Sequence, residues 1–116
     1  MAGHAATVHS YYRLVDDQQF EQMLQLFHPE IHYQRGDLAI TGIDQMKEFY
    51  TRERTIKSGR HTIDALVEDG AMVVTRGTMD GVLDGGEEVS IGFADFLEFQ
   101  DDLIWRRFTY FKNRSV

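Results

Sequence analysis

The sequence predicts one small α+β domain, in which three helices pack against a bent antiparallel sheet and enclose a pocket. Three observations lead to this prediction. The first half carries apolar residues at helical spacing, and the second half consists of strand-like segments separated by tight turns. The length of 116 residues suits one hydrophobic core, so residues 1–116 are expected to form a single domain.

Apolar residues recur three and four positions apart in the first half, which is typical of amphipathic helices. The three stripes are Val8, Tyr11, Tyr12 and Val15, then Phe20, Met23, Leu24 and Phe27, then Ile43, Met46, Phe49 and Tyr50. Asp17 is expected to cap the second helix and Pro29 to end it. A short strand at residues 31–35 follows. The third helix is expected to start near Thr41 and to end at residues 58–59.

The second half is rich in Val, Ile, Thr and aromatic residues, which favour strands. Four segments are predicted as strands: residues 60–68, 71–83, 88–99 and 103–112. Turn-forming residues separate them: Asp69-Gly70, Asp84-Gly85-Gly86 and Asp101-Asp102. Because tight turns join consecutive strands, these four are expected to form an antiparallel meander.

The composition excludes several classes of site and partner. The net charge of −7 argues against binding to nucleic acid or to an anionic membrane surface, because phosphate groups require a positive field. The chain has no Cys, which rules out disulfides, thiolate chemistry and Cys-ligated metals. No run approaches the roughly 20 apolar residues that span a bilayer, and residues 1–10 do not resemble a secretory signal. A cytoplasmic protein is therefore expected.

Asp95 breaks the apolar pattern of its own strand. One face of this strand consists of Val89, Ile91, Phe93, Leu97 and Phe99, and Asp95 lies on that same face. A carboxylate on a buried face is unfavourable unless it is paired or protonated. Asp95 is therefore predicted to lie in the pocket. Two alternatives stay open, namely a bulge at Ala94 that turns Asp95 outward and a structural ion pair with an Arg.

Four Arg residues are further candidates for the pocket. Arg35 continues the inward phase of its short strand. Arg76 lies on a strand with two apolar faces, so periodicity does not decide its direction. Arg106 and Arg107 are adjacent and must point to opposite faces, with Arg107 in phase with Trp105. One of these two is expected to face the helices.

A running pattern of apolar and aromatic residues occurs in four segments, namely YYRLVDDQQFEQMLQLFHPEIHYQ, TGIDQMKEFY, GFADFLEF and DDLIWRRFTYF. In this pattern the chain resembles the nuclear transport factor 2-like superfamily, which includes ketosteroid isomerases, SnoaL-like polyketide cyclases, scytalone dehydratase and limonene epoxide hydrolases. The resemblance covers almost the whole chain and implies a cone-shaped α+β roll. It also implies a homodimer through the outer sheet face, where Phe96 is expected together with either Trp105 or the pair Phe108 and Tyr110.

Ketosteroid isomerase is the nearest comparison within this superfamily. The resemblance places its two oxyanion hydrogen-bond donors on Tyr11 and Asp95, and a supporting Tyr on Tyr50. The Asp that serves as its general base is replaced by Arg35, and Asp37 could reach the same space if the loop bends. A standard steroid isomerase is therefore not expected.

Two other members of the superfamily supply further comparisons. SnoaL-like cyclases rely on a pocket Asp and His, for which Asp95 and His61 are the candidates. In limonene epoxide hydrolases an Arg corresponds to Arg76, but their two Asp residues fall on Thr78 and Thr109. The carboxylates that activate water in that family are therefore missing.

Two hypotheses follow, and neither requires a metal or another cofactor. In the first, the protein is an isomerase, cyclase or dehydratase acting on a small, largely apolar carbonyl compound. Tyr11 and a protonated Asp95 would donate to the developing enolate oxygen, with Asp37 or His61 as the base. In the second, Asp95 pairs with an Arg and the pocket binds an anionic ligand. The residues expected to line the pocket are Tyr33, Arg35, Tyr50, His61, Arg76, Phe93, Trp105 and Arg107.

Overall fold

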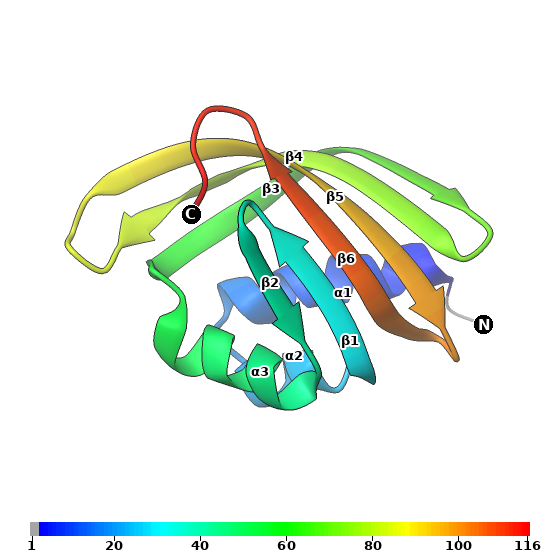
Figure 1. Cartoon of the computed structure of the whole chain (residues 1–116). Helices are drawn as coiled ribbons and strands as arrows, with labels where there is room; N and C mark the ends of the chain where they lie inside the picture. Colours follow the sequence, from blue (N-terminus) through cyan, green and yellow to red (C-terminus); the bar gives the residue numbers. More distant parts are fainter. Residues whose placement is uncertain (1–2) are drawn as a thin grey trace.

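Three helices lie on the concave side of a curved six-stranded sheet in the computed structural model, which describes residues 3–116 (Figure 1). The elements in chain order are α1 (His4–Asp16), α2 (Phe20–Leu24), β1 (Phe27–Arg35), β2 (Leu38–Thr41), α3 (Ile43–Glu48), the π-helical turn η1 (Phe49–Glu53), β3 (Ile56–Asp69), β4 (Met72–Leu83), β5 (Glu88–Gln100) and β6 (Leu103–Phe111). Residues 1–2 lie outside the described residues. They begin the segment, residues 1–10, that is not expected to be a secretory signal. The predicted α+β class, with helices first and strands later, is confirmed.

The sheet has the strand order β2-β1-β6-β5-β4-β3. Strands β3 to β6 pair antiparallel with their sequence neighbours, as the tight turns predict. β1 pairs parallel with β6, so the sheet is mixed. This parallel pair brings Arg35 beside Thr109, although the two residues are far apart in the sequence.

The predicted helix stripes form the core beneath the sheet. Their buried members are Val8, Tyr11, Tyr12, Val15, Met23, Phe27, Met46, Phe49 and Tyr50. Each large apolar side chain that is fully buried contributes about 1.5–3 kcal/mol to stability. In β5 the predicted alternation holds without a break, so Asp95 faces the core and no bulge occurs at Ala94.

The second helix and the first strand differ from the prediction. α2 ends at Leu24, and Phe27 and Pro29 both belong to β1 rather than to the helix. Pro29 is tolerated in the strand because the β1–β6 ladder is interrupted between Phe27 and His32, so no ladder hydrogen bond needs its missing N–H. The predicted cap is also wrong, since α2 begins after Gln19 and has no side-chain cap.

The third helix is shorter than predicted, and a strand precedes it. Thr41 ends β2, and Gly42, at φ +85°, makes the turn into α3. The helical segment ends at Glu53, and Gly59 lies within β3, where a Cβ would come within 2.9 Å of the Met79 sulfur. This Gly therefore marks a close approach of strands rather than a helix end. No described helix is long and apolar enough to cross a membrane.

Candidate functional site

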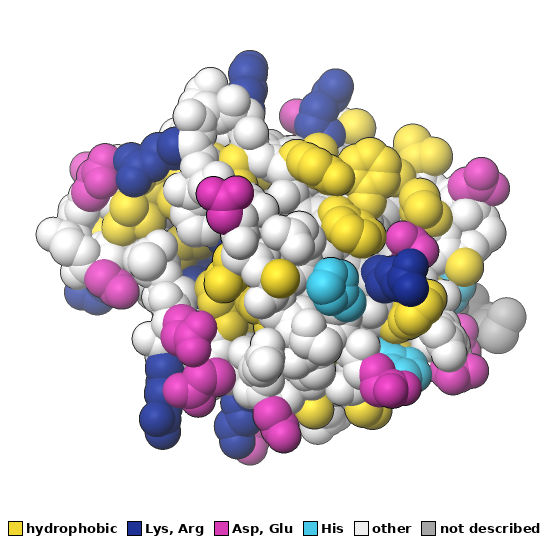
Figure 2. Space-filling view, in the orientation of Figure 1, with side chains coloured by type: hydrophobic (Ala, Val, Ile, Leu, Met, Phe, Trp, Pro, Cys, Tyr) yellow, Lys and Arg dark blue, Asp and Glu magenta, His cyan; other side chains and the backbone are white. Residues whose placement is uncertain are grey.

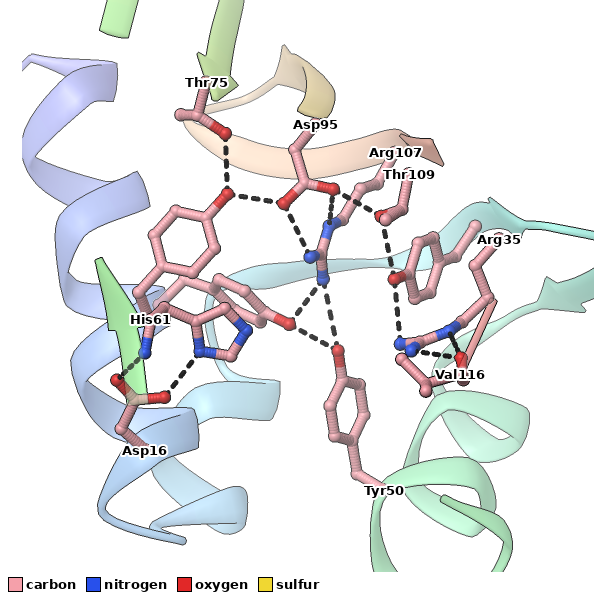
Figure 3. Close-up of polar contacts among 12 residues, drawn as sticks. Asp16, Arg35, Tyr50, His61, Thr75, Asp95, Arg107, Thr109 and Val116 are labelled. Atoms are coloured by element: carbon pink, nitrogen blue, oxygen red, sulfur yellow. Dashed lines mark hydrogen bonds and ion pairs between the residues drawn. The ribbon is translucent and has the colours of Figure 1, made fainter. Parts of the chain in front are cut away.

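Asp95 lies at the centre of a buried polar cluster on the inner face of the sheet (Figure 3). Its side chain is 0 % exposed. Oδ2 accepts hydrogen bonds from Arg107 Nη2 at 2.8 Å and from Tyr12 Oη at 2.5 Å. Oδ1 accepts from Arg107 Nε at 3.3 Å and from Thr109 Oγ1. A guanidinium and two hydroxyl groups therefore satisfy both oxygens of this carboxylate.

This environment keeps Asp95 ionised. Burial alone would raise the pKa of the Asp95 carboxyl. The charge of Arg107 and the hydrogen bonds from Arg107, Thr109 and Tyr12 outweigh burial, so the pKa of Asp95 lies below its ordinary value. Burial would likewise lower the pKa of the Arg107 guanidinium, yet Asp95 raises that pKa well above its ordinary value. The prediction that a protonated Asp95 donates to an enolate oxygen is therefore wrong. The ion pair with an Arg, the alternative, is present.

A bulge in β6 determines which of the two adjacent Arg residues faces inward. The β5–β6 ladder shifts at Trp105, which is an extra residue on the β6 side. Arg107 thereby joins Ile104 on the inner face and is 3 % exposed. Trp105 lies on the outer side with Arg106, whose guanidinium carbon is 4.2 Å from the indole centroid. The predicted pocket position of Trp105 is therefore wrong.

Arg107 also holds two Tyr hydroxyl groups at the edge of a cavity. Its Nη1 donates to Tyr11 Oη and, at 3.1 Å, to Tyr50 Oη, and the two hydroxyls share a short hydrogen bond. One hydroxyl proton makes that Tyr–Tyr bond, and the other has no acceptor within residues 3–116. Burial raises the pKa of Tyr11 well above its ordinary value, although Arg107 opposes this. The pair therefore offers one proton to a ligand at neutral pH.

The remaining hydroxyl groups are oriented by Asp95. Because Thr109 donates its single proton to Asp95, Tyr33 must be the donor in its 2.9 Å bond with Thr109. Tyr12 likewise donates to Asp95, so Thr75 donates to Tyr12 at 2.8 Å. Burial, with the charge of Asp95 next in importance, raises the pKa of Tyr12 well above its ordinary value. One ionised carboxylate thus determines the direction of every hydroxyl around it.

His61 and Asp16 form a second pair, at the left of Figure 3 and away from Arg35. His61 Nδ1 lies 2.6 Å from Asp16 Oδ1, and the His61 main-chain N–H donates to Asp16 Oδ2 at 2.8 Å. In the neutral imidazole with its proton on Nδ1, Nε2 keeps a lone pair. The ring packs beside Tyr12 and Phe93, with centroids 5.2 and 5.4 Å away. Asp16 therefore orients an imidazole whose second nitrogen can accept a proton.

A small cavity lies among these groups. Its volume is about 20 Å³, enough for about one water molecule. The predicted pocket residues that line it are Tyr11, Tyr33, Arg35, Tyr50, His61, Phe93 and Arg107. Apolar side chains complete the wall, among them Ile56, Met79 and Ile91. Asp95 lies behind Arg107 and acts on the cavity only through its neighbours.

Comparison with known proteins identifies the family. The family profile of the SnoaL-like domain matches residues 8–107. The chain belongs to the SnoaL-like domain family. No sequence among curated proteins matches it significantly.

Solved structures share the fold of this SnoaL-like domain. An NTF2-like protein of unknown function from Burkholderia pseudomallei is 18 % identical, with a TM-score of 0.86 over 97 % of this chain and 92 % of that one. An LEH-like epoxide hydrolase from M. tuberculosis is 18 % identical, with a TM-score of 0.83 over 94 % and 82 %. A proposed SnoaL-like polyketide cyclase from Shewanella putrefaciens is 12 % identical, with a TM-score of 0.81 over 96 % and 90 %. These similarities confirm the predicted fold, which hosts many functions.

Two residues predicted for the site lie away from the cavity of the SnoaL-like domain. Arg76 is exposed on the outer face of β4, where its Nε donates to Asp64 Oδ1 at 2.8 Å. Asp37 is exposed in the two-residue turn between β1 and β2 and does not line the cavity. Both predictions are wrong, and Asp37 is excluded as the base in this arrangement.

Sequence reasoning missed Asp16, Tyr12 and Thr75 as members of the site. Asp16 and His61 are separated by 45 positions, and no local pattern links them. Tyr12 reads as an ordinary core residue because it occupies the apolar stripe of α1. Within the described part of the SnoaL-like domain, no three His, Asp or Glu side chains gather in the way a metal ion requires.

Proposed function

We propose that this SnoaL-like domain is an enzyme that moves a proton on a small carbonyl compound, in the manner of an isomerase or cyclase. Tyr11 and Tyr50, supported by Arg107, would donate a hydrogen bond to the developing enolate oxygen. His61, oriented by Asp16, would be the general base. The observation that supports this most strongly is the unassigned hydroxyl proton of the Tyr11–Tyr50 pair, held by a buried cation at a cavity that His61 also lines.

Arg107 gives the donor pair its strength. An enolate oxygen placed against Tyr11 would meet a proton donor already polarised by a guanidinium that Asp95 holds in position. Donors that are oriented before the reaction need no reorganisation, and removing one typically costs about 2.7–4 kcal/mol of transition-state stabilisation. Asp95 in this proposal is a positioning residue and stays ionised throughout.

His61 suits the role of the base for two reasons. Its pairing with Asp16 directs Nε2 away from that carboxylate, and the imidazolium formed on protonation would be stabilised by the same carboxylate. Both side chains are largely shielded from solvent, at 10 % and 19 % exposure. Since Asp37 is exposed on the far turn, His61 is the strongest candidate for a base among the described residues.

The second candidate function is a non-catalytic binding domain for an anionic ligand. Three Arg residues, Arg35, Arg54 and Arg107, line the same cavity, and this supports an anionic group in the ligand. An activity like that of the epoxide hydrolases is less well supported. Arg76 lies on the outer face, and the positions of the water-activating carboxylates are Thr78 and Thr109.

Proton exchange tests the enzymatic proposal. The protein is incubated in D₂O with small enolisable ketones, cyclohexanone and 2-tetralone, and loss of the α-proton signal is followed by ¹H NMR. His61→Ala is expected to lower the exchange rate at least about 100-fold, and Tyr11→Phe to lower it by a similar factor. His32→Ala, on the outer side of β1, is the matched control. Exchange no faster with the native protein than with His61→Ala would contradict the enzymatic proposal.

We also propose a homodimer through the outer sheet face. Figure 2 shows hydrophobic side chains gathered on this face, and the exposed ones include Met72, Phe96 and Tyr110. Together with Phe108 they border a shallow apolar depression. Analytical ultracentrifugation checks the assembly: Tyr110→Glu is expected to shift a dimer toward the monomer, whereas an unchanged sedimentation coefficient would place the interface elsewhere.

A further inference from the structure

Arg35 is a buried cation that pairs with no Asp or Glu side chain of the described residues. It is 7 % exposed, and within residues 3–116 no Asp or Glu oxygen lies within 4.0 Å of its guanidinium. Three aromatic rings surround it, with centroids 5.0 Å (Phe49), 5.2 Å (Phe111) and 5.7 Å (Tyr33) from its central carbon. A buried guanidinium needs an acceptor for each of its N–H groups, so the acceptors around Arg35 indicate which chemical group its site suits.

One main-chain oxygen occupies the place where such a partner would bind. Arg35 Nε and Nη2 both donate to the oxygen of Val116, at 3.0 and 2.5 Å. Two N–H groups of one guanidinium edge converging on oxygen is the arrangement with which Arg binds carboxylates. The third group, Nη1, donates to Tyr33 Oη at 3.1 Å. Figure 3 shows Val116 beside Arg35 at this end of the cavity.

A second donor near Arg35 also lacks a partner. The Nε of Arg54 is buried, belongs to the lining of the same cavity, and has no hydrogen-bond partner among the described residues. Its guanidinium carbon lies 5.6 Å from the centroid of the Tyr50 ring. An unsatisfied buried donor destabilises the structure by about 1–3 kcal/mol unless it finds an acceptor. Arg54 therefore adds an unused donor to the positive charge of Arg35 and Arg107.

The segment that carries Val116 lies beyond the strands and is held by the packing of Val116 against the core, by Arg35 and by few other contacts. Beyond β6, the main-chain N–H of Lys112 donates to Gly92 at 2.8 Å, and Arg114 forms an exposed ion pair with Glu87 at 3.0 Å. Exposed pairs of this kind contribute about 0–1 kcal/mol. The cavity that the segment closes has room for about one water molecule, so a larger ligand must displace part of its wall. Residues 113–116 are the part that leaves without breaking a strand.

From these contacts we propose that Arg35 binds a carboxylate group of the ligand, and that residues 113–116 occupy this position until the ligand displaces them. The ligand class is a small carboxylic acid with an apolar or aromatic body, because Phe49, Phe111 and Phe93 flank the position. Arg54 supplies a further hydrogen bond. This inference deepens the proposed function, since it assigns a carboxylate to the substrate of the same cavity.

Direct binding measurements test the inference independently of catalysis. Phenylacetate and its neutral counterpart phenylacetamide are titrated into ¹⁵N-labelled protein, and Kd is obtained from chemical-shift changes. Phenylacetate is expected to bind at least about tenfold more tightly than the amide. Arg35→Met is expected to remove this preference, and Arg35→Lys to reduce it, because Lys keeps the charge but loses the two-pronged geometry. Arg76→Met, on the outer face, is the matched control and leaves the preference unchanged.

A variant that ends at Arg114 tests the displacement. It is expected to bind phenylacetate about fivefold or more tightly than the longer chain, with no change for the amide. Equal affinities of acid and amide, or a preference that survives in a folded Arg35→Met variant, would overturn the carboxylate site. Unchanged affinity in the shortened variant would overturn the displacement. The exchange test is therefore repeated with a keto acid, 4-oxo-4-phenylbutanoate. Carboxylate binding without proton exchange on either the ketones or the keto acid would uphold this site and contradict the enzymatic proposal, so the two failures are distinguishable.

Discussion

Two Arg side chains reach the same cavity from neighbouring strands, yet their partners differ. Arg107 is held by the carboxylate of Asp95, with Nη2 to Oδ2 at 2.8 Å. Arg35 has only the hydroxyl of Tyr33 and the main-chain oxygen of Val116 as acceptors. Both are almost fully buried, and both lie near the face of the Tyr33 ring. Burial and residue type are therefore the same, but only Arg107 pairs with an Asp or Glu side chain of the described residues.

This difference separates a structural cation from a binding cation. Arg107 and Asp95 neutralise each other, so removing either one leaves an uncompensated charge in the interior. Removing Arg35 leaves no Asp or Glu side chain of the described residues unpaired, only the half-buried oxygen of Val116. The first pair is expected to determine whether the domain folds, and the second cation to determine what the domain binds.

The largest expected effect is that of Arg107→Met. It is predicted to lower the free energy of unfolding by about 3–5 kcal/mol, because Asp95 stays buried and loses its cation. Urea denaturation at pH 7 measures the change. Arg76→Met, which breaks only an exposed pair with Asp64, is the control and is expected to cost less than about 1 kcal/mol. A loss no larger than that of the control would mean that the pair does not hold the interior together.

Tyr12→Phe is expected to have the next largest effect. It removes one hydrogen bond to the ionised carboxylate of Asp95 and leaves Thr75 without its acceptor, at a predicted cost of about 1.5–3 kcal/mol. Tyr110→Phe, an exposed Tyr on the outer face, is the matched control and is expected to be neutral. Equal denaturation midpoints for the two variants would contradict the role assigned to Tyr12.

Acid should weaken the Asp95 pair in a defined direction. Because the pKa of Asp95 is lower in the folded protein than its ordinary value of 3.8, its contribution to stability is fully present above that value and is lost as pH falls toward the folded pKa. The difference in unfolding free energy between native protein and Asp95→Asn should therefore be constant from pH 7 to about 5 and shrink below it. Denaturation curves at several pH values check this, and a difference that grows on acidification would contradict the ionised state.

Arg35→Met should have the smallest effect on stability. It is predicted to lower the free energy of unfolding by no more than about 1 kcal/mol, because the methionine can pack among the same three rings and no buried Asp or Glu side chain is left unpaired. Measured beside Arg107→Met in the same urea titration, it gives the comparison directly. Similar losses for both variants would remove the distinction between the two cations.

Sequence reasoning predicted correctly the features that lie within one helix or strand, and it missed features that depend on pairing between strands. The stripe of α1 and the phase of β5 were predicted correctly, including the inward position of Asp95, because side-chain direction within one element depends on residue spacing alone. The end of α2, the strand β2 and the place of Pro29 in β1 were not predicted. β1 pairs with β6, which is distant in sequence, and β2 forms a hairpin with β1 across a two-residue turn; in both cases pairing overrides local preference.

The same distinction applies to the two cations. By itself the sequence determined an α+β domain of the nuclear transport factor 2-like class, an acidic chain without thiol chemistry, and an Asp on an apolar face. Only the tertiary structure decided that a bulge at Trp105 turns Arg107 inward against Asp95, and that Arg35 meets the oxygen of Val116 instead of an Asp or Glu side chain. The protonation state of a buried group depends on charges a few ångströms away in space. Those neighbours come from strands and turns that no local pattern brings together.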